Sequence, residues 1–223
     1  MKIFKNKYSL KVTNNSILVI GNFDGLHKGH VSILSEASRF AKKNKRKIGL
    51  LTFDPNPKEF FSKLKNFKII SLREKQKILS TMKIDYLIIL KFNKSLRNMT
   101  AENFIEKILK KKIRPSKIIV GKEFKFGKNR AGSPNLLKKY FFTKTALQKK
   151  INGKKISSSQ IRKLISLGNV SQVKKLLGRH WSINGKVVSG DKIGRKLGYR
   201  TANVFLKDCI LPLRGVYVTR VYL

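Results

Sequence analysis

The sequence is short of cysteine, histidine and long apolar runs, and each shortage excludes a class of protein. The single cysteine, Cys209, cannot form an internal disulfide, which is typical of a chain kept in a reducing cytoplasm. No apolar run approaches the roughly 18 residues that a membrane span requires. Residues 1–12 also lack the apolar core of a secretory signal. We therefore expect a cytoplasmic protein without a membrane segment.

Acidic residues are scarce as well: 11 Asp and Glu stand against 52 Lys and Arg, a formal net charge of +41. Such a positive field attracts nucleotides, nucleic acids and acidic lipid head groups. The excess is mostly lysine spread along the whole chain, which is typical of a compositional bias of the genome, and no stripe of arginine and aromatic residues stands out. We expect small anionic ligands and no specific nucleic-acid partner, and whether the charge is functional stays open.

Apolar runs alternate with segments of helical periodicity over most of the 223 residues. The pattern predicts strands over 16–21, 47–53, 85–90 and 117–121. It predicts helices over 30–43, 71–82, 100–113, 157–168 and 169–178, with Ser71 and Thr100 opening two of them as N-caps. This alternation predicts an α/β fold, in which helices cover both faces of a parallel sheet and ligands bind at the carboxyl ends of the strands.

The texture changes after His180 to short, glycine-punctuated segments of β character. We expect a domain boundary there, with an α/β domain over 1–180 and a β-rich portion over 181–223. No low-complexity linker or internal repeat separates the two portions.

The stretch GNFDGLHKGH places His27 and His30 directly after the strand predicted over 16–21. Gly21 and Gly25 allow backbone to approach a ligand closely, and the helix that follows directs unpaired N–H groups toward a phosphate. A metal clip and a plain strand-to-helix turn are the alternatives. A histidine metal site needs three or four ligands, and among nearby residues only Asp24 is a further candidate, so we expect no protein metal site.

Three later segments carry weaker signals of the same kind. ISSSQIR places Ser158, Ser159 and Arg162 at a helix start, where they can cap the helix or grip an anion. GKEFKFGKNRAG (121–132) is a glycine-bracketed loop that can cover a nucleotide or lie on the surface. GDKIGRKLGYRTANV (190–204) contains Thr201 and Asn203, and is either a phosphate loop or a series of hairpin turns.

Together and in this order, the segments GNFDGLHKGH, TFDPNPKEFF, GKEFKFGKNRAG, ISSSQIR and LLGRHWSINGKVVSGDKIGRKLGYRTAN resemble the bacterial bifunctional riboflavin kinase/FMN adenylyltransferase (FAD synthetase) family. The resemblance runs from about Ile17 to the end of the chain. It implies a Rossmann-like HxGH nucleotidyltransferase domain followed by a truncated, β-barrel-type riboflavin kinase portion. It also implies that ATP and FMN react, with Mg²⁺, to give FAD and pyrophosphate, and that riboflavin is a further substrate of the kinase.

The resemblance also implies roles for individual residues. His27, His30 and Arg162 would be catalytic, holding the ATP phosphates and the outgoing pyrophosphate. The residues implied to bind nucleotide or phosphate are Gly21, Asn22, Phe23, Asp24, Gly25, Ser158 and Ser159. Those implied for the flavin or substrate loop are Asn56, Glu123, Phe124, Phe126 and Arg130. Thr201 and Asn203 would bind Mg-nucleotide in the kinase portion.

The chain departs from the family pattern at several positions. Glu123 replaces Asp or Asn, Ser159 replaces Thr, Asn56 replaces His or Gln, and Arg200 replaces the proline of the kinase motif P-T-A-N. The family's kinase uses a downstream glutamate as base, whereas Glu123 is the last glutamate of this chain. We therefore expect FMN adenylyltransferase activity, and an incomplete or vestigial kinase.

Two competing hypotheses remain beside it. The HxGH domain can adenylylate another phosphate, such as a pantetheine or nicotinate nucleotide, although TFDPNP and GKEFKFG are of the flavin type. A basic module that binds RNA or nucleotides without catalysis is the non-enzymatic alternative, and it predicts binding with a steep salt dependence. The sequence does not predict an oligomeric state.

Overall fold

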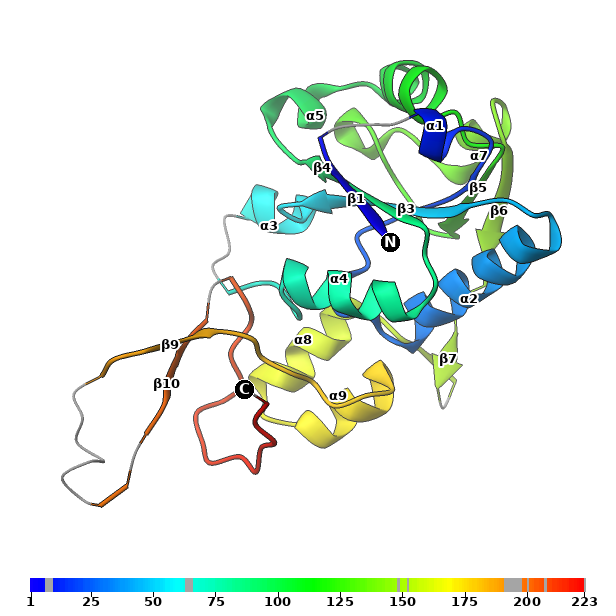
Figure 1. Ribbon diagram of the computed structural model, residues 1–223. Coiled ribbons are helices and arrows are strands. Elements are labelled where there is room, and N and C mark those ends of the chain that lie inside the picture. The colour runs from blue at the N-terminus through cyan, green and yellow to red at the C-terminus, as the bar shows by residue number, and fades with distance from the viewer. Residues whose placement is uncertain are drawn as a thin grey trace.

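A six-stranded parallel sheet forms the centre of the molecule (Figure 1). The computed structural model describes residues 1–6, 10–62, 66–147, 149–151, 153–190, 198–199, 201–206 and 208–222. The strand order is β1-β4-β3-β2-β5-β6, and every neighbouring pair is parallel. The bounds are Lys2–Lys5 (β1), Ile17–Ile20 (β2), Ile48–Asp54 (β3), Tyr86–Lys91 (β4), Lys117–Gly121 (β5) and Phe142–Ala146 (β6).

The four inner strands are the four that the apolar runs predict. All of β2 is buried, and so are most residues of β3, β4 and β5, as expected for strands covered on both faces. The edge strands β1 and β6 were not predicted, because KIFK and FTKTA contain exposed lysines and, in β6, half-buried threonines, and lack a continuous apolar run. Lysine on an edge strand is a common protection against pairing with another chain.

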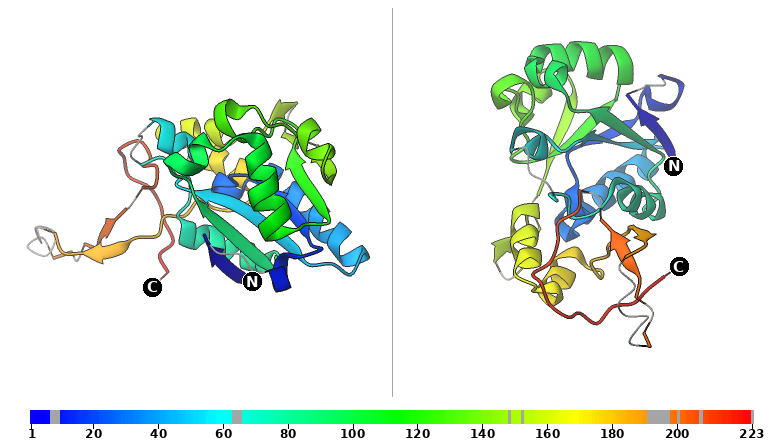
Figure 2. Two further views of the ribbon diagram at one scale, coloured as in Figure 1. Left: turned by 90° about the horizontal axis from the view of Figure 1, so that it is seen from above. Right: turned by 90° about the vertical axis from the view of Figure 1, so that its left-hand side faces the viewer.

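Helices cover both faces of the sheet (Figure 2), and a separate apolar core lies on each face. On one face lie α2 (Lys28–Lys43), α4 (Leu72–Thr81), α8 (Ser158–Ser166) and α9 (Val170–Leu177). On the other lie α6 (Ala101–Asn103), the π-helical η2 (Phe104–Ile113) and α7 (Pro134–Lys138). Alternate residues of one strand serve opposite cores: Val19 packs into the first, and Leu18 into the second. The predicted α/β class with helices on both faces is confirmed.

The helix starts follow the predicted capping chemistry. The side chains of Ser71, Thr100 and Ser157 each accept a hydrogen bond from the backbone N–H three residues on, at the starts of α4, α6 and α8. The π-helical register of η2 was not predicted, because apolar spacing does not separate a π-helix from an α-helix. The remaining short elements are α1 (Leu10–Thr13), η1 (Asp24–Leu26), α3 (Pro57–Ser62), α5 (Lys94–Asn98), η3 (Lys128–Arg130), β7 (Lys150–Ile151) and β8 (Lys154–Lys155).

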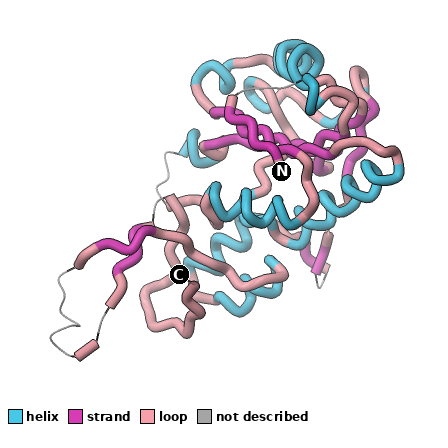
Figure 3. Tube along the Cα trace, in the orientation of Figure 1, coloured by secondary structure: helices cyan, strands magenta, loops and turns pink. Residues whose placement is uncertain are grey.

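Beyond α9 the chain forms a projecting antiparallel hairpin of β9 (Lys186–Val188) and β10 (Asn203–Phe205), seen in Figure 1 and Figure 3. It then returns to the body, where Cys209 bridges Lys68 in parallel register. Residues 191–197, which lie between the two strands in the sequence, and the predicted departure at Arg200 are outside the described residues. The domain boundary near residue 180 stays a prediction.

Within the described part of the chain, no helix combines the length and the apolar character needed to cross a membrane.

Candidate active site

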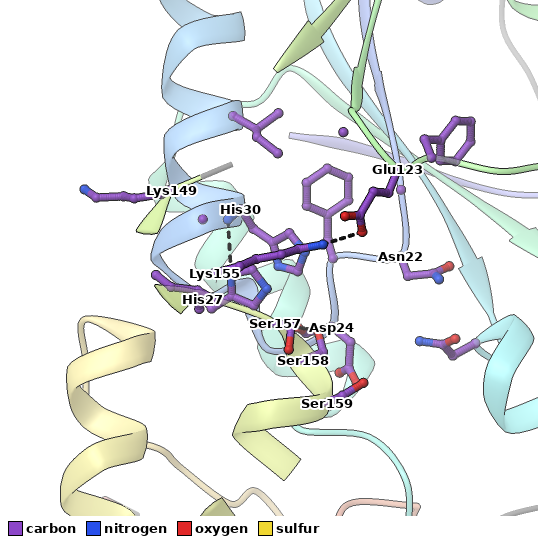
Figure 4. Close-up of a pocket in the computed structure, with 18 of the residues that line it drawn as sticks. Asn22, Asp24, His27, His30, Glu123, Lys149, Lys155, Ser157, Ser158 and Ser159 are labelled. Atoms are coloured by element: carbon purple, nitrogen blue, oxygen red, sulfur yellow. Dashed lines mark hydrogen bonds and ion pairs between the residues drawn. The ribbon is translucent and has the colours of Figure 1, made fainter. Parts of the chain in front are cut away.

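A cavity of about 470 Å³ opens at the carboxyl ends of the central strands (Figure 4). Gly21 directly follows β2, Glu123 lies just after β5, and Asn56 lies just after β3. The cavity is lined by Ile20, Gly21, Asn22, Phe23, Asp24, His27, Gly29, His30, Ile33, Asn56, Lys58, Gly121, Glu123, Phe124, Lys149, Lys155, Ile156, Ser157, Ser158, Ser159 and Arg162. It lies where ligands bind in parallel α/β sheets.

This cavity brings together most of the residues that the sequence assigned to the nucleotide. Five assigned residues lie elsewhere. Gly25 is a buried residue of the loop that packs against Ile69, and Phe126 and Arg130 line a neighbouring cavity. Thr201 is exposed, and Asn203 is exposed on β10.

His27 caps the N-terminus of α2, because its Nδ1 accepts a hydrogen bond from the backbone N–H of His30 at 3.3 Å. With Nδ1 acting as acceptor, the proton of the neutral ring is on Nε2. Burial lowers the pKa of His27 from its ordinary 6.5 to about 4, and the nearby positive charge of Arg179 also lowers it. His27 is therefore a neutral imidazole at neutral pH.

His30 lies directly against His27. The two rings are stacked with their centroids 3.6 Å apart and their planes 17° apart, and the ring of Phe23 lies 4.9 Å from His30 on another side. Burial lowers the pKa of His30 well below its ordinary value, and the charges of His27 and Lys75 add to the effect. Among the described residues, no group hydrogen-bonds to the buried Nδ1 of His30.

Asp24 and Arg162, assigned separately to the nucleotide pocket and to the pyrophosphate, form one buried ion pair. The Asp24 carboxylate also accepts a hydrogen bond from the Ile69 N–H at 3.1 Å. The Arg162 guanidinium donates through Nε to the Phe67 carbonyl at 2.8 Å and lies 3.7 Å above the Phe67 ring. Arg162 therefore ties α8 to the loop, while its side chain still lines the cavity.

The second helix at the cavity is α8, whose N-cap is Ser157. The hydroxyl of Ser158 donates to the backbone carbonyl of Asp24 at 3.0 Å, so the ISSSQIR segment is joined to GNFDGLHKGH directly. The N-termini of α2 and α8 thus meet at one cavity, and the positive ends of both helix dipoles favour an anion there.

Three lysines of the cavity were not among the assigned residues: Lys58, Lys149 and Lys155. Lys155 forms an ion pair with Glu123 across the cavity (Figure 4). Lys58 lies within the TFDPNPKEFF segment and Lys155 directly precedes the ISSSQIR segment, and these positions are the signal in the sequence that could have found them. In a chain with 52 Lys and Arg, residue type by itself does not single out a functional lysine.

A second cavity, of about 630 Å³, shares Asn22, Lys58, Glu123 and Phe124 with the first. Its walls are aromatic, and the phenylalanines among its lining residues are Phe53, Phe61, Phe92, Phe104, Phe124 and Phe126. The rings of Phe124 and Phe126 are stacked at 5.6 Å, and Arg130 lines the same space. The GKEFKFGKNRAG loop therefore contributes to both cavities.

The described residues contain no group of three or more His, Cys, Asp and Glu side chains placed to hold a metal ion. Both carboxylates that line the first cavity, Asp24 and Glu123, are paired with cations. A metal ion would therefore have to bring most of its ligands with it.

In class, this is an α/β nucleotidyltransferase domain followed by a short antiparallel portion. The FAD synthetase family model matches residues 9–160, and the riboflavin kinase family model matches residues 177–223. The chain belongs to the bifunctional riboflavin kinase/FMN adenylyltransferase family, which confirms the resemblance found in the sequence motifs.

Individual relatives align with nearly the whole of this chain. A bifunctional riboflavin kinase/FMN adenylyltransferase from Buchnera aphidicola subsp. Schizaphis graminum is 39% identical over 99% of this chain and 73% of its own length. The protein of the same name from Escherichia coli is 34% identical with the same coverage. A crystal structure described as a macrolide-efflux protein from Streptococcus pneumoniae has a TM-score of 0.85 at 30% identity, covering 97% of this chain and 73% of that one.

Proposed function

We propose that the chain transfers the adenylyl group of ATP to FMN, giving FAD and pyrophosphate. One observation carries the proposal: the histidine cavity and the aromatic cavity are neighbours that share the lining residues Asn22, Lys58, Glu123 and Phe124. An anion site beside a flat, aromatic site suits a reaction between the phosphates of ATP and of a flavin nucleotide.

The ATP phosphates would lie in the first cavity, at the N-termini of α2 and α8. His27 donates from Nε2, since its Nδ1 is already an acceptor within the helix cap. Because His27 and His30 are neutral, they can donate hydrogen bonds to phosphate oxygens without the cost of two stacked positive charges. Such donors are most effective where negative charge develops in the transition state.

In the proposed reaction, an oxygen of the FMN phosphate forms a bond to the α-phosphorus of ATP. The bond from that phosphorus to the oxygen bridging to the β-phosphorus breaks, and the electron pair leaves with pyrophosphate. No covalent enzyme intermediate and no proton transfer to the phosphate nucleophile are needed. The chain's contribution is alignment of the two nucleotides and stabilisation of charge.

Mg²⁺ belongs to this proposal as an ion carried by ATP. The cavity fits such an ion because its two carboxylates, Asp24 and Glu123, are already paired, and Mg²⁺ is usually held by substrate phosphates, waters and only one or two carboxylates. When bound, it offsets phosphate charge.

The flavin ring would occupy the second cavity. Phe124 and Phe126 present stacked aromatic surface, and Arg130 supplies a positive charge at its edge. Asn56 lines the first cavity, so we assign it to the region where the phosphates of the two nucleotides meet.

The kinase named in the relatives is a separate activity, and we infer that the described residues of the C-terminal portion do not supply the general base that it needs. Thr201 and Asn203 are exposed. The sole carboxylate after Asn203 in the sequence is Asp208, whose Oδ2 lies 3.8 Å from Lys68 Nζ, in an ion-pair cluster with Asp54 and Glu59. A carboxylate held in that cluster is poorly suited to act as a general base.

The direct test is incubation of the chain with FMN, ATP and Mg²⁺, followed by chromatography of the flavins. Formation of FAD with one equivalent of pyrophosphate supports the proposal, and no FAD despite intact FMN binding refutes it. A parallel panel of pantetheine phosphate and nicotinate mononucleotide separates the flavin reaction from other adenylyl transfers. RNA binding that is weak at physiological salt removes the nucleic-acid alternative.

A further inference from the structure

In the loop that carries the two histidines, three of four successive residues have positive φ angles, and two of these three are not glycine. Phe23, Gly25 and Leu26 have φ angles of 48°, 79° and 42°. Glycine adopts such angles without penalty, but Phe23 and Leu26 do not. Strained backbone at a functional site persists only where the surrounding structure holds it in place. The groups that hold this loop are therefore part of how the site is built.

One of these groups is a buried lysine. Lys75 lies on α4 with 8% of its surface exposed, and its Nζ donates a hydrogen bond to the Asn22 carbonyl at 2.9 Å. The hydroxyl of Thr52, at the end of β3, donates to the same carbonyl at 3.0 Å. The carbonyl directly before the strained Phe23 is thus held by two donors from two different elements.

Arg179 holds the other end of the loop. Its Nη2 donates to the Gly25 carbonyl at 2.7 Å, and its Nη1 donates to the Leu26 carbonyl at 3.1 Å. One planar guanidinium thus joins the carbonyls of two successive positive-φ residues. Arg179 follows α9 directly after Gly178, within the stretch that the riboflavin kinase family model matches.

These contacts turn the partly negative carbonyl oxygens of the loop toward fixed donors. In a trans peptide the N–H points opposite to the carbonyl, so the Phe23 N–H is directed away from Lys75 and Thr52. The two cations also act on the histidines: the charge of Lys75 is felt at His30, and that of Arg179 at His27. The positive charges of Lys75 and Arg179 therefore lie behind the loop, and neither side chain lines the cavity.

We propose that Lys75 and Arg179 form a carbonyl clamp, a pair of positioning residues that hold the strained loop in the conformation that binds the ATP phosphates. The proposal deepens the proposed adenylyl transfer and rests on it for the identity of the ligand. It also makes the Arg179 junction, C-terminal to the FAD synthetase match at 9–160, a part of the adenylyltransferase site.

The test compares Lys75→Met and Arg179→Met with two controls from the same helices, Lys77→Met on α4 and Lys175→Met on α9, whose side chains are exposed. Steady-state FAD synthesis gives kcat and KM for ATP, calorimetry gives the affinity for Mg-ATP, and flavin fluorescence gives the affinity for FMN. Thermal unfolding is recorded for every variant. Arg179→Lys is included because it keeps the charge but cannot bridge both carbonyls as a guanidinium does.

We expect each clamp variant to lower kcat/KM for ATP by tenfold or more and to weaken Mg-ATP binding, with FMN affinity within twofold of wild type. Arg179→Lys should give an intermediate loss, and both controls should match wild type. Lys75→Met should still fold, because the hydroxyl of Thr52 continues to donate a hydrogen bond to the Asn22 carbonyl.

Clamp variants that bind Mg-ATP and turn over like the controls would overturn the proposal. So would a loss of ATP and FMN binding in parallel with a fall in melting temperature, because that pattern marks a merely structural role. Should a methionine variant fail to fold, Thr52→Val tests the same Asn22 carbonyl with a smaller change. Wild type that binds Mg-ATP but makes no FAD refutes the proposed function and leaves the calorimetric comparison to decide the clamp.

Discussion

The imidazole rings of His27 and His30 are stacked with centroids 3.6 Å apart, at the point where β2 passes through a short loop into α2. Two positive charges at that separation would repel strongly, and burial lowers the pKa of both rings. In the proposed reaction the pair would therefore act as two neutral hydrogen-bond donors, with nearby lysines and helix N-termini supplying the positive field.

Replacing His30 should impair the reaction far more than flavin binding. We expect His30→Ala to lower kcat for FAD synthesis by about a hundredfold or more, since a donor to developing charge is lost. The FMN dissociation constant should stay within about twofold of wild type. His180→Ala is the matched control, because His180 is exposed and outside both cavities. An unchanged rate for His30→Ala would remove the role assigned to this residue.

Stability should fall as the pH is lowered through the range set by His27. Folding lowers the pKa of His27 from 6.5 to about 4, so the unfolded chain takes up the proton first. The contribution of neutral His27 to the free energy of unfolding is complete above pH 6.5 and is lost between pH 6.5 and about pH 4. Below about pH 4 it no longer changes with pH. The loss amounts to about 3 kcal/mol.

Denaturant unfolding of wild type and of His27→Gln, measured from pH 4 to pH 7, isolates this contribution. The difference in unfolding free energy between the two proteins should shrink by about 3 kcal/mol from pH 7 to pH 4. A difference that does not change with pH would mean that His27 keeps its ordinary pKa in the folded protein.

Breaking the Asp24–Arg162 pair should destabilise the fold. The two side chains are 7% and 13% exposed, so Arg162→Met leaves a buried carboxylate without its cation and should cost about 3 kcal/mol. Adding Asp24→Asn should restore part of that loss. Glu106→Gln, which breaks the exposed Glu106–Lys110 pair, should cost less than about 1 kcal/mol. Equal costs for the two pairs would contradict the buried arrangement.

The aromatic cavity should control affinity for the flavin. Phe124→Ala is expected to raise the FMN dissociation constant about tenfold, because removing an aromatic stacking partner costs a bound base-like ring about 1 to 3 kcal/mol of binding free energy. The affinity for ATP should change little. Phe205→Ala, at an exposed position of β10, serves as the control. The opposite pattern, weaker ATP binding with normal FMN binding, would mean that ATP and not FMN occupies the aromatic cavity.

The inner sheet and most of the histidine cavity could be predicted because their signals are local. SILVIG and DYLIIL are continuous apolar runs, and Ser71 and Thr100 cap their helices through contacts only three residues long. The positions of the GNFDGLHKGH and ISSSQIR segments at one cavity follow from the parallel order of the strands.

The long-range contacts could not be predicted in this way. Nothing in the sequence distinguishes Lys75 from the exposed Lys77, because helical spacing buries one and exposes the other only once α4 packs on the sheet. The Arg179 contacts with Gly25 and Leu26 join residues about 150 positions apart. The edge strand β6 was missed because its exposed residues alternate with half-buried threonines, without an apolar run.

The most direct test of the account is to follow individual phosphates of ATP in the reaction with FMN. With ATP radiolabelled at the α-phosphate, the label should appear in FAD, and with ATP labelled at the γ-phosphate it should appear in pyrophosphate. With riboflavin in place of FMN, no flavin should become labelled from either position. With FMN as the substrate, transfer of the γ-phosphate to the flavin, or a failure of the α-label to enter FAD, would contradict adenylyl transfer to FMN as the reaction of this site.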